Sequence, residues 1–102
     1  MAHQTQNKLI RDRVPEIIRE SGRECDVEVL DEAAFRKALR EKLMEEAEEV
    51  AATVTDNELV TELADLREVM ETLIAAYGLD EEEIKLVQAQ RRHERGGFQS
   101  RL

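Results

Sequence analysis

The chain has 102 residues, enough for a single domain over 1–102, and its 24 acidic and 15 basic residues give a net charge of −9. This acidity and the scarcity of aromatic residues (two Phe, one Tyr) argue against a protein that binds nucleic acid polymers. Cys25 is the single cysteine and cannot form an internal disulfide. The polar residues 1–7 carry no secretory signal, and no apolar stretch approaches the ~20 residues that span a bilayer. We therefore expect a cytoplasmic protein that enters no membrane.

Capping signals divide the chain into helices. Four are predicted, over about 13–21, 31–53, 56–77 and 80–94. Asp31 can cap the second helix, Thr55 and Glu58 form a capping box before the third, and Gly78 suits a left-handed C-terminal cap. The alternation of apolar and charged residues over 25–29 predicts an extended segment, too short to make a sheet alone. We expect an all-α protein of the four-helix-bundle type.

The second predicted helix places acidic residues on and beside its apolar stripe. On a helical wheel Glu46 falls inside the stripe, Glu49 lies on its flank and Glu45 lies further round. An ionised carboxylate on a core-facing stripe is costly unless another charge compensates it. Lys42, one turn earlier, can form an ion pair with Glu46.

A second acidic pair lies on the third predicted helix. Glu62 and Asp65 are three residues apart on one flank of its apolar face. Because the loop before this helix is short, the two helices should be antiparallel neighbours, with the pair facing Glu46 and Glu49. Oxygen ligands without His or Cys select a hard cation, Mg²⁺ or Mn²⁺. The alternative is a solvated acidic face, since 38% of the residues are charged.

Basic residues gather at both ends of the chain. From residue 85 onward there are five Lys and Arg against one Glu, and Lys8 and Arg11 lie near the start. Arg92 and Arg95 complement the dipole of the last predicted helix, but beside Gly96 and Gly97 they also suit phosphate binding. The acidic residues in the middle of the chain and the basic residues at its two ends together indicate a polyphosphate substrate bridged by Mg²⁺.

The motif Glu45-Glu46-x-x-Glu49, followed after twelve residues by Glu62-x-x-Asp65, resembles the EExxE…ExxD signature of the MazG-like all-α nucleotide pyrophosphohydrolases. Dimeric dUTPases and phosphoribosyl-ATP pyrophosphatases are relatives of that family. Residues 8–15 and 95–98 look like its phosphoribosyl-ATP pyrophosphohydrolase-like branch. The resemblance implies a four-helix module that assembles as a homodimer or homotetramer, binds Mg²⁺ (with Mn²⁺ as a substitute) and splits nucleoside triphosphates into monophosphate and pyrophosphate.

The resemblance also implies roles for individual residues. Glu45 would position or deprotonate the attacking water, a role that it could exchange with Glu46. The metal ligands would be Glu46, Glu49, Glu62 and Asp65. The phosphate contacts, some of them from a neighbouring subunit, would be Lys8, Arg11, Arg92 and Arg95.

We therefore predict a Mg²⁺-dependent nucleotide pyrophosphohydrolase that removes unwanted nucleotides. Two alternatives stay open. One is a phosphoribosyl-ATP pyrophosphatase of histidine biosynthesis, which the same metal motif would serve. The other, from a different class, is a non-catalytic acidic helical module that assembles through its apolar faces.

Overall fold

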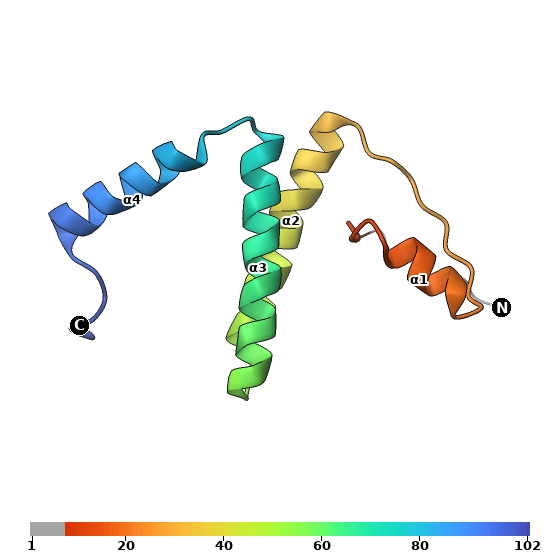
Figure 1. Cartoon of the computed structure of the whole chain (residues 1–102), viewed down its shortest axis with the longest axis horizontal. Coiled ribbons are helices and arrows are strands. Elements are labelled where there is room, and N and C mark those ends of the chain that lie inside the picture. Colours follow the sequence, from red (N-terminus) through yellow and green to blue (C-terminus); the bar gives the residue numbers. More distant parts are fainter. Residues whose placement is uncertain (1–7) are drawn as a thin grey trace.

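The computed structural model describes residues 8–102, and the sequence prediction for residues 1–7 lies outside them. The described chain forms four helices and no strand, which confirms the all-α prediction (Figure 1). The helices are α1 (Val14–Glu20), α2 (Glu32–Ala51), α3 (Asp56–Ala76) and α4 (Glu81–Arg95). None of these helices has the length and apolar character needed to cross a membrane.

Local side-chain chemistry sets the helix boundaries. The Asp31 carboxylate accepts a hydrogen bond from the Ala34 amide at 2.8 Å, which caps α2 as predicted. At the start of α3 the Thr55 hydroxyl accepts from the Glu58 amide at 3.2 Å, and Glu58 accepts from the Val54 amide at 3.1 Å. This capping box therefore reaches one residue further back than the usual reciprocal bond to the cap itself.

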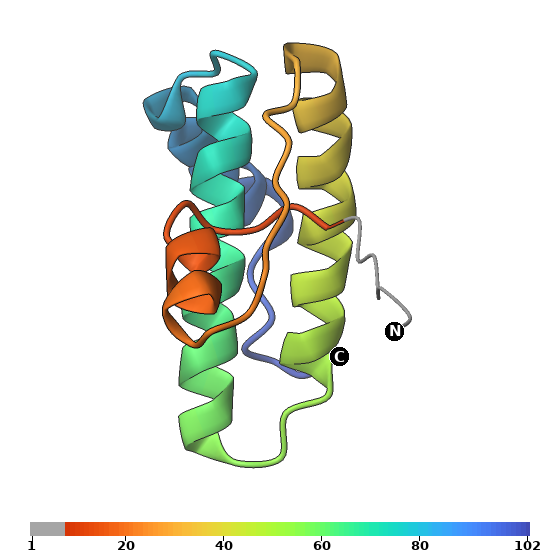
Figure 2. The ribbon, with the colours of Figure 1, turned by 90° about the vertical axis from the view of Figure 1, so that its right-hand side faces the viewer.

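Helix α2 ends two residues before the predicted limit of 53. The Thr53 hydroxyl donates to the Val50 carbonyl at 2.8 Å, and the Thr53 amide makes a three-residue turn to the same carbonyl at 3.3 Å. These bonds take the place of a further helical turn and bring the chain round into α3 within a few residues. The prediction that α2 and α3 are antiparallel neighbours is confirmed, and the two form a helical hairpin (Figure 2).

The hairpin is held at its other end by Arg36 of α2. Its guanidinium donates two hydrogen bonds to the Ala76 carbonyl, at 3.2 and 3.1 Å, and lies 4.6 Å from the centre of the Tyr77 ring. The carbonyl is one that the end of α3 leaves without a helical partner. Within the hairpin, the buried apolar residues are Leu39 and Val69.

Helices α1 and α4 lie on opposite sides of the hairpin, and α4 projects away from α3 (Figure 1). Every residue of α4 is exposed, including the apolar Ile84, Leu86 and Val87. The radius of gyration is 17.5 Å, against about 13 Å for a compact chain of this length. The four helices thus do not close around one core within the single chain, and the predicted bundle and oligomer stay predictions.

Candidate metal centre

The helical hairpin brings together three of the four predicted metal ligands. Glu46 and Glu49 of α2 and Glu62 of α3 each offer a carboxylate oxygen, and these oxygens all lie within 4.8 Å of one another. Glu46 and Glu49 share one side of α2 because they are three residues apart, and the antiparallel packing places Glu62 opposite them. Three oxygen donors this close are the kind of ligand set that a hard divalent cation takes.

Glu46 is the most buried member of this acidic cluster, defined as Glu46, Glu49 and Glu62. Only 6% of Glu46 is exposed, whereas Glu62 is half-buried and Glu49 is exposed. Oε2 of Glu46 and Oε2 of Glu62 are both inaccessible to solvent and have no hydrogen-bond partner among residues 8–102. A buried acceptor without a partner costs about 1–3 kcal/mol, and more when charged. The donor chemistry and these two unpartnered oxygens therefore fit a cation held between α2 and α3.

The electrostatics of Glu46 agree with this fit. Burial raises the pKa of Glu46, and the neighbouring Glu49 carboxylate raises it further. The Lys42 ammonium, 3.5 Å from Oε1 of Glu46, opposes both effects. The predicted Lys42–Glu46 ion pair is thus confirmed, but it leaves Oε2 of Glu46 without a partner.

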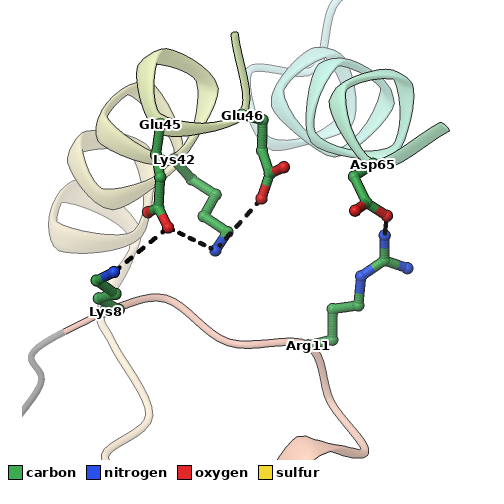
Figure 3. Close-up of polar contacts among 6 residues, drawn as sticks. All are labelled: Lys8, Arg11, Lys42, Glu45, Glu46 and Asp65. Carbon is green, nitrogen blue, oxygen red and sulfur yellow. Dashed lines mark hydrogen bonds and ion pairs between the residues drawn. The ribbon is translucent and has the colours of Figure 1, made fainter. Parts of the chain in front are cut away.

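Glu45, the predicted water-activating residue, lies beside the acidic cluster and faces two ammonium groups. Its Oε1 is 3.4 Å from Lys8 Nζ and 3.7 Å from Lys42 Nζ (Figure 3). Lys42 therefore contacts both Glu45 and Glu46 and links the two carboxylates. A small pocket of about 60 Å³ lies here, lined by Lys8, Leu9, Ala38, Glu41, Lys42 and Glu45.

Asp65, the fourth predicted ligand, is not part of the acidic cluster. Its Oδ1 instead accepts a hydrogen bond from Arg11 Nη2 at 2.8 Å (Figure 3). Arg11 belongs to the N-terminal strap, which we define as residues 8–11. The strap crosses from α2, where Lys8 contacts Glu45, to α3, where Arg11 contacts Asp65. Both basic residues of the strap, Lys8 and Arg11, which the sequence assigned to phosphate, thus contact carboxylates.

The remaining predicted phosphate contacts, Arg92 and Arg95, lie in the last turn of α4. Because α4 projects away from the hairpin, these two residues lie apart from the acidic cluster within this chain (Figure 1).

Neither a protein-family model, nor a curated protein, nor a solved structure was found to match the chain.

Proposed function

We propose that this protein is a Mg²⁺-dependent nucleotide pyrophosphohydrolase that cleaves nucleoside triphosphates into monophosphate and pyrophosphate. The observation that carries the proposal is Glu46, a buried carboxylate with an unpartnered oxygen that faces Glu49 and Glu62. Lys42 compensates one oxygen of Glu46, and a cation between the three carboxylates would compensate the other, which has no partner. The EExxE…ExxD motif that resembles the MazG-like enzymes contains the same three residues.

In this proposal Glu46, Glu49 and Glu62 hold Mg²⁺, and Asp65 joins them. Bound Mg²⁺ supplies neutralisation of the phosphate charge and fixes the orientation of the phosphate oxygens. Glu45 lies next to the ligands without being one of them, which suits a residue that orients the attacking water. The water oxygen forms a bond to the α-phosphorus and gives a proton to the Glu45 carboxylate, the bond from that phosphorus to the oxygen that bridges to the β-phosphorus breaks, and pyrophosphate leaves with the electron pair of that bond.

We further propose that the working form is a homodimer or homotetramer. The exposed apolar side chains of α4 and the small buried core of the hairpin leave surface that a second copy of the chain would cover. Packing of two hairpins would form a four-helix bundle from two chains, which differs from the bundle within one chain that the sequence predicts. In such an assembly Arg92 and Arg95 of a neighbouring subunit are the candidates to contact the phosphates, because α4 projects away from the hairpin of its own chain.

The test is release of pyrophosphate by the purified full chain, incubated with natural and damaged nucleoside triphosphates and with phosphoribosyl-ATP. Each substrate is assayed with Mg²⁺, with Mn²⁺ and with EDTA. We expect metal-dependent release from one or more nucleoside triphosphates. Release from phosphoribosyl-ATP alone would instead assign the chain to histidine biosynthesis. No release from any substrate would refute the enzyme proposal and favour the non-catalytic helical module.

A further inference from the structure

The contact between Arg11 and Asp65 joins the N-terminal strap to the flank of the acidic cluster. Asp65 is half-buried on α3 and lies one turn after Glu62 on the same side of that helix. The Arg11 side chain is 61% exposed, so the guanidinium reaches the carboxylate from solvent. The bond, at 2.8 Å, has the length of a strong charge-assisted hydrogen bond.

A guanidinium and a metal ion are alternative counter-charges for one carboxylate. An Asp65 oxygen that accepts from Arg11 has that lone pair occupied, and the fixed positive charge of Arg11 also repels a second cation nearby. Lys8 contacts Glu45 on α2 in the same way, so the strap supplies one basic residue to each helix of the hairpin. The strap therefore neutralises part of the acidic site from within the chain.

We propose that Arg11 competes with the divalent cation for Asp65, so that the N-terminal strap regulates metal binding at the acidic cluster. This inference rests on the proposed metal site. When the cation is bound, Asp65 would leave Arg11 and join Glu46, Glu49 and Glu62 as a ligand. Arg11 is then left beside the loaded site without its carboxylate, where it is free to contact an anion that the metal holds.

The proposal predicts that loss of the Arg11 charge tightens metal binding. The experiment measures the dissociation constant of Mn²⁺ for the full chain by electron paramagnetic resonance, in the wild type and in Arg11→Gln. Arg13→Gln is the matched control, because Arg13 is near in sequence and pairs with Glu16 on α1 instead of with the site. We expect Arg11→Gln to bind Mn²⁺ about two- to fivefold more tightly, the range that corresponds to a surface ion pair. Arg13→Gln should change the constant by less than about 1.5-fold, because salt screens exposed distant charges.

The carboxylate partner provides the second arm. In an Asp65→Asn background, Arg11→Gln should no longer tighten Mn²⁺ binding, because there is no charged carboxylate left to compete for. Circular dichroism at the same protein concentration checks that all variants keep their helices. Equal Mn²⁺ binding by the wild type and Arg11→Gln, or equal tightening by Arg13→Gln, would overturn the strap proposal and leave the metal site intact. Absence of Mn²⁺ binding in every variant would overturn both proposals.

Discussion

Replacement of Glu46 by Gln tests how much stability the metal-free protein loses at the acidic cluster. The substitution keeps the side-chain volume and removes the charge from a residue that is 6% exposed. The Gln amide can donate to Glu49 or Glu62 where Oε2 of Glu46 had no partner, which should return about 1–3 kcal/mol. Loss of the Lys42 ion pair should cost less, because the Lys42 side chain is partly exposed. Lys42 also keeps Glu45 as a partner. We therefore expect Glu46→Gln to be more stable in EDTA by about 1 kcal/mol, or about 4–8 °C in Tm.

The stability difference between Glu46→Gln and the wild type should depend on pH in a defined direction. Burial and Glu49 raise the pKa of Glu46 above its ordinary value of 4.5, so the folded protein retains this proton where the unfolded chain has lost it. The free energy of unfolding should therefore fall as the pH rises from the ordinary value through the raised pKa. Glu46→Gln lacks this titrating group. The free energy of unfolding that the variant gains over the wild type in EDTA should therefore be larger at pH 8 than at pH 4, which lies below the ordinary pKa of 4.5.

Thermal unfolding followed by circular dichroism, at one fixed protein concentration, measures both quantities. The matched control is Glu48→Gln, since Glu48 is an exposed residue on the same helix, and its effect should stay within about 0.5 kcal/mol. Added Mg²⁺ should stabilise the wild type and the control but not Glu46→Gln. A lower Tm for Glu46→Gln in EDTA at pH 8 would refute the reasoning that the buried carboxylate is uncompensated.

Two further predictions concern the scaffold. Gly78→Ala should lower the free energy of unfolding in urea by about 1–2 kcal/mol, because Gly78 has a φ of +62°, which disfavours a residue with a Cβ. No atom lies within 4 Å of an added Cβ, so a steric clash would not contribute to this loss. An unchanged free energy of unfolding would therefore contradict the left-handed backbone conformation at Gly78. The double substitution Ile84→Gln and Val87→Gln on α4 should lower the oligomer mass in sedimentation velocity while the helical content is kept. An unchanged mass would contradict a role for this face in assembly.

Much of the hairpin and of the acidic cluster could be predicted because the signals are local. Thr55 and Glu58 are three residues apart, and the bonds that cap α3 need nothing from the rest of the chain. The burial of Glu46 likewise follows from its place on the apolar stripe of one helix, which fixes the side that it faces. Helical periodicity and one short turn were enough to bring Glu62 toward it.

The contacts of the N-terminal strap could not be predicted in this way. Lys8 and Glu45 are 37 residues apart, and Arg11 and Asp65 are 54 residues apart, so no periodicity relates them. With 24 acidic residues in the chain, opposite charge alone does not select a partner, and the path of the strap across the hairpin does. The opposite charges at both positions were the only signal in the sequence.

The position of α4 could not be predicted from the sequence for a different reason. Its caps and its apolar residues identify a helix that should bury one side, and the helix is present from Glu81 to Arg95. The pattern does not say which surface covers that side, and within this chain the side is exposed. The assignment of Arg92 and Arg95 to phosphate rests on their charge, on the neighbouring Gly96 and Gly97 and on the family resemblance, none of which indicates where α4 lies.

The central claim, that the acidic cluster holds the cation on which hydrolysis depends, is tested most directly by Glu49→Gln. Glu49 is an exposed member of the cluster, so its substitution should leave the fold intact while it removes one of three ligand oxygens. Glu48→Gln, which changes the adjacent residue of the same helix by the same chemistry, is the control. In a pyrophosphate-release assay with Mg²⁺, we predict activity in the wild type and Glu48→Gln and a loss of at least about 100-fold in Glu49→Gln. Full pyrophosphate release by Glu49→Gln would contradict the account.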